Sequence, residues 1–212
     1  MTKNNNRTLT PAQVRETMSS ILKAESEAIS QIPVTDDYCD AVNIIVERVH
    51  RSGGKVVTSG MGKAGQIALN IATTFSSTGT PAFYLHPGEA QHGDLGLIQP
   101  NDTLLLISNS GKTREIIDLV GVTHKLYAVI PVIVITGNPD SVLSELADVT
   151  IHTGGAPEVC PLGLTPTVST TVMTVIGDVL VVNTMKAIDF DKAQYAKRHH
   201  GGYLGDAARN NN

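Results

Sequence analysis

Short runs of apolar residues alternate with stretches of helical periodicity between residues 55 and 152. The apolar runs cover residues 55–58, 82–85, 103–107, 132–136 and 149–152. Between them, apolar residues recur at helical spacing, most clearly over 64–75 and 114–120. Strands that are apolar throughout and alternate with helices are typical of a parallel sheet with helices on both faces. We therefore predict an α/β fold, a three-layer α-β-α sandwich around a five-stranded parallel sheet.

Three more helices are expected outside this alternation. Thr10-Pro11 is a helix-start signal, and the helical spacing after it runs to about residue 31. A second helical pattern over 41–49 ends at Ser52-Gly53-Gly54, a C-terminal signal. These two helices are interpreted as packing or oligomer elements. The third starts at Thr165-Pro166 and has almost no polar face, so we expect it to be buried, in part by another subunit.

Length and composition describe one soluble globular domain. The 212 residues are 41% hydrophobic and 17% charged, so we expect a single domain over residues 10–208 with disordered tails at 1–9 and 209–212. The net charge of −4 without a basic block argues against nucleic acid as a partner. The polar N-terminus lacks the apolar core of a signal peptide, the apolar run 126–135 is too short to span a membrane, and there are only two cysteines. These features predict a cytoplasmic protein without a membrane partner.

The loop from Ser108 to Thr113 lies between a predicted buried strand and a predicted helix start. Backbone N–H groups, hydroxyls and the positive end of the helix dipole meet there, which suits a phosphate group. The same residue types are also favoured in an ordinary helix cap. The end of the loop resembles a Walker A motif, but that motif needs a glycine where Leu106 stands, which argues against a nucleoside triphosphate. The remaining interpretation is a single phosphate bound by Ser108, Asn109, Ser110 and Thr113.

A glycine-rich turn, Gly60-Met61-Gly62-Lys63-Ala64-Gly65, matches the G-x-G-x-x-G pattern between a strand and a helix. A dinucleotide site would also need an acidic residue at the end of the second strand. That strand ends in His86-Pro87 instead. We therefore interpret the turn as a close backbone approach to a smaller ligand, with Ser59, Gly60 and Gly62 at its phosphate and Lys63 near its charge.

The stretch from His86 to Gly96 is rich in titratable residues and glycines. It is interpreted as a substrate-facing loop in which His86 and His92 contact the substrate. The alternative is a turn with capping Asp and His side chains. A metal site built from His86, His92 and Asp94 lacks a recognised ligand spacing, and we predict no bound metal.

Glu115, Glu158 and His199 are the candidate acid–base groups. Glu115 lies one helical turn past the serine loop, and Glu158 lies in the Gly/Pro-rich loop before the buried helix. A lone glutamate is usually a surface charge, but a carboxylate beside strand-end loops can move a proton between adjacent carbons, as aldose–ketose interconversion requires. His199 is interpreted either as an acid or base near neutral pH or as an exposed tail histidine.

Seven motifs, taken in order, closely resemble the sugar isomerase (SIS) domain of D-arabinose-5-phosphate isomerases over roughly residues 10–208. The motifs are Gly60-Met61-Gly62-Lys63, Ser76-Ser77-Thr78-Gly79-Thr80-Pro81, His86-Pro87-Gly88-Glu89-Ala90, His92-Gly93-Asp94-Leu95-Gly96, Ser108-Asn109-Ser110-Gly111, Cys160-Pro161-Leu162-Gly163-Leu164 and Gly201-Gly202-Tyr203-Leu204-Gly205. The resemblance implies a five-stranded parallel sheet in a homo-oligomer, a dimer or tetramer whose sites are completed by a neighbouring subunit.

The resemblance also implies a reaction and a set of catalytic residues. The family interconverts D-ribulose 5-phosphate and D-arabinose 5-phosphate, the first step towards Kdo in lipopolysaccharide or capsule. By motif, Lys63, Glu115, Glu158 and His199 match its catalytic positions. The reaction is expected to pass through an enediol and to need no metal or organic cofactor.

Three departures and two alternatives accompany this expectation. Many members continue into a pair of CBS domains, whereas this sequence stops at Asn212; Lys112 stands where Glu is common, and His200 replaces a proline in the closing motif. By register, His199 remains the matching histidine. The alternatives are a non-catalytic sensor of a sugar phosphate or nucleotide sugar on the same fold, and an isomerase of another phosphosugar such as a hexulose phosphate.

Overall fold

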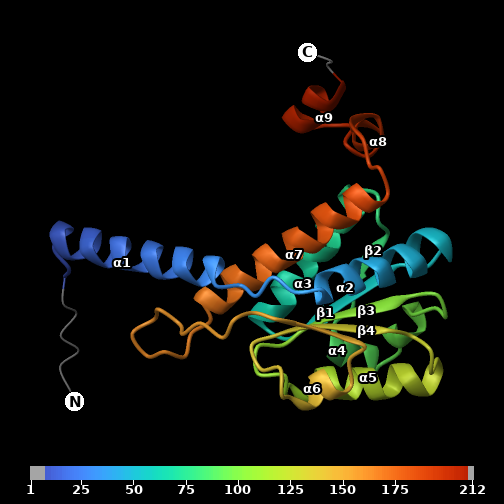
Figure 1. Ribbon diagram of the computed structural model, residues 1–212, viewed down its shortest axis with the longest axis horizontal. Helices are drawn as coiled ribbons and strands as arrows, with labels where there is room; N and C mark the ends of the chain where they lie inside the picture. The colour runs from blue at the N-terminus through green and yellow to red at the C-terminus, as the bar shows by residue number, and fades with distance from the viewer. Residues whose placement is uncertain (1–7, 210–212) are drawn as a thin grey trace.

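The five predicted strands form one parallel sheet. The computed structural model describes residues 8–209 and places the strands in the order β2-β1-β3-β4-β5 (Figure 1). All neighbouring strands are parallel, which confirms the predicted sheet. The strands are β1 (Val56–Gly60), β2 (Ala82–Tyr84), β3 (Thr103–Ile107), β4 (Val132–Thr136) and β5 (Val149–His152).

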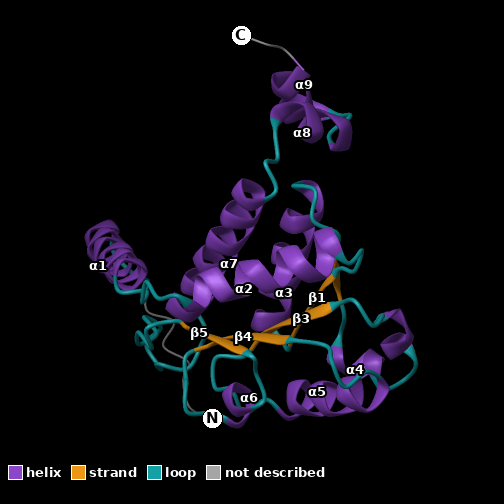
Figure 2. Ribbon diagram, turned by 45° about the vertical axis from the view of Figure 1, so that its right-hand side comes forward, coloured by secondary structure: helices purple, strands orange, loops and turns teal. Residues whose placement is uncertain are grey.

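Helices cover both faces of the sheet, which confirms the predicted three layers (Figure 2). One face carries α2 (Asp37–Ile45), α3 (Lys63–Ser77) and α7 (Val168–Ala187), and α2 continues into the π-helical segment η1 (Val46–Arg51). The opposite face carries α4 (Pro87–Ala90), the 3₁₀ segment η2 (Asp94–Leu97), α5 (Arg114–Leu126) and α6 (Val142–Glu145).

The central strands are buried on both faces, as their continuously apolar sequence requires. Every residue of β1, β3 and β4 is buried. Along β3, Leu105 and Ile107 pack in the core shared with α2, α3 and α7, whereas Leu104 and Leu106 pack in the core shared with α5. Successive side chains of a strand point to opposite faces, so each face of the sheet has its own hydrophobic core.

Helix α7 is the long apolar helix expected near residue 165, but its predicted start is wrong. The N-cap is Thr167 and not Thr165, and the first helical residue is Val168. The physical reason is that the Glu158 carboxylate accepts the backbone N–H groups of Thr167 and Ser169, at the start of the first turn. By length and composition α7 is apolar enough to cross a membrane, but half of that stretch, 50%, is buried inside the fold.

Two segments extend away from the sheet (Figures 1 and 2). Helix α1 (Pro11–Ser30) begins with a capping box between Thr10 and Gln13, which confirms the predicted start signal. The other segment, here called the C-terminal arm (residues 191–209), holds α8 (Lys192–Arg198) and α9 (Gly202–Arg209) and follows the far end of α7.

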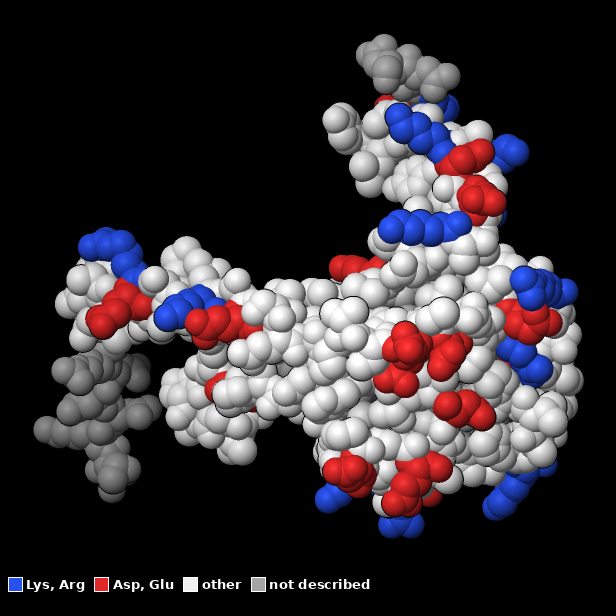
Figure 3. Space-filling model, viewed as in Figure 1, with Lys and Arg blue, Asp and Glu red and all other residues white. Residues whose placement is uncertain are grey.

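The predicted tails fall mostly beyond the described range. Residues 1–7 and 210–212 lie outside it, and Arg209 is the last residue of α9. On the face of the molecule shown in Figure 3, acidic and basic side chains are interspersed, and the basic ones do not form one continuous patch.

Candidate active site

A cavity of about 380 Å³ lies at the carboxyl ends of β1 and β3, against the first turns of α7. The chain passes from β1 to the edge strand β2 and then returns to the other side of β1 as β3. This reversal of strand order is where open parallel sheets bind ligands. The cavity is lined by Met61, Lys63, Ala64, Ser108, Asn109, Ser110, Thr113, Glu158, Gly163, Leu164, Pro166, Ser169, Thr170 and Met173.

The glycine-rich turn closes tightly over the end of β1. Gly62 has φ +57° and ψ −123°, which only glycine adopts without strain. A Cβ on Gly65 would lie 2.6 Å from the carbonyl oxygen of Gly60, so α3 can approach the strand only without a side chain there. No side chain caps the start of α3, and its first N–H groups remain available to an anion. Ser59 lies outside the cavity, because it is buried and its hydroxyl donates to the Leu85 carbonyl at 2.7 Å.

The serine loop, residues 108–113, folds back on itself at the end of β3. The hydroxyls of Ser108 and Thr113 share a hydrogen bond of 2.8 Å, and the N–H of Gly111 donates to the Ser108 carbonyl at 3.1 Å. The Ser110 hydroxyl accepts the N–H of Lys112 at 3.2 Å. The loop therefore presents three hydroxyls to one cavity at the start of α5, as the phosphate-cradle interpretation requires.

Glu158 enters the cavity from the loop that precedes α7. Its Oε2 accepts the N–H of Thr167 at 2.7 Å, the hydroxyl of Thr167 at 2.8 Å and the N–H of Ser169 at 3.4 Å. Burial by itself would raise the pKa of Glu158, but the hydrogen bonds from Ser169 and Thr167 outweigh it and hold the pKa below its usual value. Glu158 is therefore a carboxylate at neutral pH.

Lys63 and Glu158 are the charged side chains that line this cavity within residues 8–209. Glu115 is exposed in the first turn of α5 and does not line it. His86 caps α4 by accepting the N–H of Gly88 at 3.2 Å, the capping role that was the alternative to substrate contact. His92 is exposed and also lies outside the lining. Across the described part of the chain, no group of three His, Cys, Asp or Glu side chains is placed to hold a metal ion.

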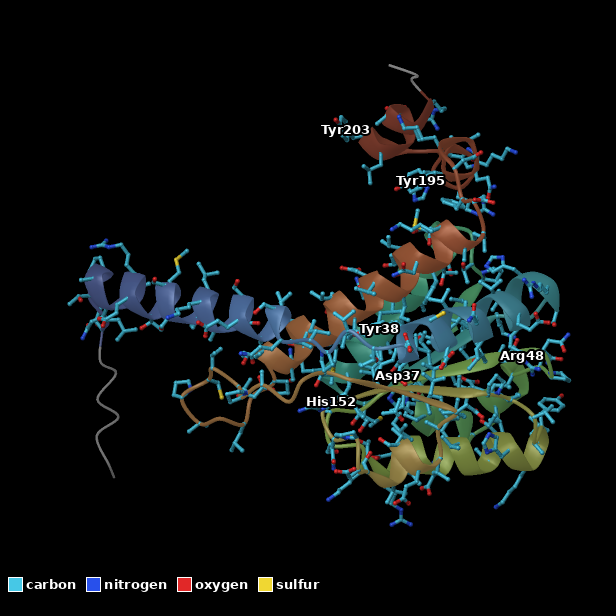
Figure 4. All side chains as sticks on the ribbon, viewed as in Figure 1. Asp37, Tyr38, Arg48, His152, Tyr195 and Tyr203 are labelled. Carbon is cyan, nitrogen blue, oxygen red and sulfur yellow. The ribbon has the colours of Figure 1, made fainter. Side chains whose placement is uncertain are left out.

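His199 lies in the C-terminal arm, at the opposite end of α7 from the cavity. Its ring stacks on Tyr195 with 3.7 Å between ring centroids and 8° between planes, and Nδ1 is 3.0 Å from the Tyr195 carbonyl oxygen. Figure 4 shows Tyr195 beyond the end of α7. A helix of 20 residues spans about 30 Å, so one chain does not bring His199 to its own cavity.

Comparison with known proteins identifies the family. The SIS domain profile matches residues 49–183. The chain belongs to the SIS family. Arabinose 5-phosphate isomerase KdsD of Yersinia pestis is 45% identical over 187 residues, which cover 87% of this chain and 55% of that protein. KdsD of Escherichia coli K12 is 45% identical over 186 residues, again 87% of this chain and 55% of the relative. The chain thus spans about half the length of these curated relatives.

Solved structures extend the comparison. A protein of Bacteroides fragilis NCTC 9343, assigned as a phosphosugar isomerase involved in capsule formation, is 62% identical with a TM-score of 0.88 and covers 90% of this chain and 99% of its own. The protein c3406 of E. coli CFT073, solved in complex with arabinose 5-phosphate, is 30% identical with a TM-score of 0.83. The match covers 90% of this chain and 100% of the c3406 chain. The SIS fold predicted from the sequence is confirmed.

The polar start of α7 was not among the predicted site residues of this SIS domain. Ser169 and Thr170 line the cavity, and Thr167 holds the Glu158 carboxylate. A usable signal was present, since hydroxyl residues cluster between a Gly/Pro-rich loop and a long apolar helix. Hydroxyl residues are also ordinary helix caps, and only the folded loop shows that they face the serine loop across one cavity.

Proposed function

We propose that this SIS domain protein interconverts D-ribulose 5-phosphate and D-arabinose 5-phosphate through an enediol intermediate. The single observation that carries the proposal is the cavity in which a carboxylate, an ammonium group and a loop of hydroxyls face one another. Its volume of about 380 Å³ is at the small end of ligand sites, which suits one sugar phosphate. The relatives named arabinose 5-phosphate isomerase support the choice of substrate.

The serine loop would hold the phosphate. Ser108, Ser110 and Thr113 offer hydroxyls, and the starts of α3 and α5 add N–H groups and the positive ends of two helix dipoles. No side-chain hydrogen bond caps either helix start, so these donors have no competing side-chain acceptor. The phosphate would thereby fix the open-chain sugar with its C1–C2 end towards Glu158 and Lys63.

Glu158 is the base that the cavity favours. The sequence left Glu115 and Glu158 as alternatives, and Glu158 alone lines the cavity. It would remove a proton from C1 of the ketose, so that the electron pair forms the C1–C2 double bond and the C2 oxygen takes the negative charge. Lys63 would stabilise that charge. Return of the proton to C2, with transfer of the O1 proton to O2, leaves the aldose.

The direct test follows the conversion itself. Purified protein is incubated with ribulose 5-phosphate, and arabinose 5-phosphate is followed by NMR; a folded wild-type protein without conversion sinks the proposal. Glu158→Gln should lower kcat by about 10³-fold or more, because it removes the base while keeping the side-chain shape. Glu115→Gln is the matched variant outside the cavity and should lower kcat less. Profiling five- and six-carbon ketose phosphates separates this substrate from another phosphosugar.

We infer that the working form is a homo-oligomer in which His199 of one subunit serves the cavity of another. His199 lies a helix length from its own cavity. Helix α1 also presents an apolar surface without a partner among the described residues, since Val14, Met18 and Leu22 are exposed by 49–58%. In the cavity of the neighbouring subunit, the His199 imidazole would assist ring opening or protonate a sugar oxygen.

Mixing two inactive variants tests this inference. Lys63→Met disables the cavity, and His199→Ala disables the donated histidine. In a mixed oligomer, a cavity with an intact Lys63 can receive an intact His199 from its neighbour, so activity should reappear. If both groups act within one chain, the mixture stays as inactive as its parts. Size-exclusion chromatography with light scattering establishes the number of subunits.

The product would supply Kdo for lipopolysaccharide or capsule, and the assignment of the B. fragilis protein to capsule formation supports the latter. The cytoplasmic location stays a prediction. Deleting the gene and measuring cellular Kdo, with arabinose 5-phosphate added back, tests the pathway.

A further inference from the structure

Thr167 makes two contacts with the same carboxylate oxygen. Its backbone N–H donates to Glu158 Oε2 at 2.7 Å, and its hydroxyl oxygen lies 2.8 Å from the same atom. The N–H of Ser169 adds a longer contact of 3.4 Å. Three donors from the start of α7 thus converge on Oε2, and none of these three contacts uses Oε1.

The hydroxyl of Thr167 has a defined direction. The N–H of Val159 donates to Thr167 Oγ1 at 3.2 Å, so the threonine oxygen is already an acceptor. A hydroxyl carries one hydrogen, and an ionised carboxylate can only accept. The hydrogen of Thr167 therefore points to Glu158, and the chain of hydrogen bonds runs in one direction from Val159 through Thr167 to Glu158.

This arrangement joins the two ends of the loop that forms one wall of the cavity. Glu158 and Val159 lie before the exposed turn at 162–165, and Thr167 lies after it, at the N-cap of α7. Gly163 and Leu164, between them, line the cavity. Loss of the Thr167 hydroxyl would remove one of the three contacts that fix Oε2, leaving the two backbone N–H groups, and would unpair the Val159 N–H at the same time.

We propose that Thr167 is the positioning residue of the proton-transfer step, holding Glu158 by its Oε2 so that the carboxylate faces the sugar in one orientation. The inference rests on the proposed isomerase function. Thr167 itself does not line the cavity, so it acts through Glu158 and not on the substrate. A base held in one orientation loses little conformational freedom on reaching the transition state, which is the advantage of such positioning.

The titratable groups around Glu158 are few. Lys63 of α3 lines the same cavity. Cys160 lies two residues along the same loop. The serine loop contributes Lys112, which is exposed and outside the lining, and α7 carries no titratable residue before Asp178. A change in the pH profile on altering Thr167 can therefore be assigned to the hydrogen bonds on Glu158.

The test compares Thr167→Val with Thr167→Ser in the ribulose 5-phosphate assay. Thr167→Val keeps the shape and removes the hydroxyl, and should lower kcat by about tenfold with a smaller change in KM. Loss of a hydrogen bond to the ionised form raises the pKa of Glu158, so the acid limb of kcat/KM should move to higher pH. Thr167→Ser keeps the hydroxyl and should retain the wild-type profile.

Thr174→Val is the matched control. Thr174 lies further along α7, outside the cavity lining, and its hydroxyl donates to the Thr170 carbonyl at 2.9 Å. The variant should leave kcat and the acid limb unchanged. If Thr167→Val does not fold, Thr167→Ala removes the same hydroxyl without a β-branched side chain and takes its place.

The outcomes separate this inference from the proposed function. No conversion by folded wild-type protein refutes the isomerase proposal itself. Conversion by the wild type together with an unchanged kcat and acid limb in Thr167→Val refutes the positioning role. A lower melting temperature with an unchanged acid limb also refutes it, since that result reports a structural role only. A carboxyl ¹³C NMR titration, assigned with Glu158→Gln, measures the pKa of Glu158 independently of turnover.

Discussion

Replacing Gly111 by alanine should destabilise the fold and weaken phosphate binding together. Gly111 occupies the bend of the serine loop with φ +63°, a left-handed conformation. A Cβ there would collide with the side chain of Ser141, which is 1% exposed and caps α6. The backbone of Gly111 also joins both sides of the bend, since its N–H donates to Ser108 at 3.1 Å and its carbonyl accepts the N–H of Leu143 at 3.2 Å.

The magnitude follows from two costs. A left-handed alanine costs about 1–2 kcal/mol relative to glycine. Forcing a methyl group into a closed space costs about 1–3 kcal/mol more. A middle value of about 3 kcal/mol lowers the melting temperature of a domain of this size by roughly 6–12 °C. Because Ser141 is buried and cannot swing away, the loop backbone must move, and the hydroxyls of Ser108 and Ser110 move with it.

Two further variants isolate these causes. Gly121→Ala makes the same chemical change in the middle of α5, where no atom lies within 4 Å of the added Cβ and φ is not positive. It should stabilise the protein by about 0.5–1 kcal/mol. The double variant Gly111→Ala with Ser141→Gly removes the collision and should recover about 1–3 kcal/mol. The backbone cost remains, together with roughly a few tenths of a kcal/mol for the lost Ser141 cap of α6.

Urea unfolding measures the free energies, and calorimetric titration with arabinose 5-phosphate measures binding. Gly111→Ala should bind the sugar phosphate at least tenfold more weakly, while Gly121→Ala binds as the wild type does. A free energy of unfolding for Gly111→Ala within about 0.5 kcal/mol of wild type would falsify the reasoning. So would a double variant no more stable than the single one, since Ser141 would then not be the obstacle.

Three shorter predictions concern titratable groups. The rate at which iodoacetamide alkylates Cys160 should rise with pH around a midpoint of about 7. Hydrogen bonds to the sulfur, the largest from the Thr165 N–H, lower the thiol pKa to about 7. Peptide mass spectrometry after timed exposure measures the alkylation rate. Asp102→Ala should lower the free energy of unfolding by about 3 kcal/mol in urea titrations, because it removes a buried carboxylate that pairs with Lys55 at 2.7 Å. Glu158→Gln should make the free energy of unfolding less sensitive to acid. The pKa of Glu158 is lower in the folded protein than in the unfolded chain. The stability that the ionised Glu158 contributes is therefore fully present above its pKa in the unfolded chain and is lost as the pH falls through its pKa in the folded protein.

Each of these three predictions has an outcome that would contradict it. A midpoint for Cys160 at the value of an unperturbed thiol would show that the turn does not hold a thiolate. For Asp102, the control is Arg51→Ala, which breaks an exposed pair with Glu47 and should cost less than about 1 kcal/mol; equal costs would contradict the argument from burial. Equal acid sensitivity of wild type and Glu158→Gln would mean that the capping contacts at α7 do not favour the ionised form.

The sheet and its loops could be predicted from local sequence. β3 and β4 are apolar at every position because both of their faces are covered, and the glycines of residues 60–65 mark a turn that tolerates no Cβ at Gly65. The serine loop and Lys63 could be proposed as site residues for the same reason. Loops at the carboxyl ends of neighbouring parallel strands meet at one edge of the sheet whatever the rest of the chain does.

Side-chain direction and distant contacts could not be predicted in this way. Ser59 lies beside the glycine turn in sequence, yet its hydroxyl is used inside the fold by Leu85. Glu115 follows the serine loop directly but does not line the cavity, whereas Glu158, about 50 residues downstream of that loop, lines it. The difference depends on how the loop before α7 returns to the sheet, which no local pattern encodes.

The sequence by itself determined the strands, their parallel arrangement and the position of the serine loop, because hydrophobic periodicity and glycine turns are local properties. The tertiary structure decided which charged groups share a cavity. It placed Glu158 with Lys63, held by Thr167 at the start of α7, and placed His199 a full helix away. These placements result from packing between segments far apart in the chain, and for His199 they lead to the proposal that the site is completed by a second copy.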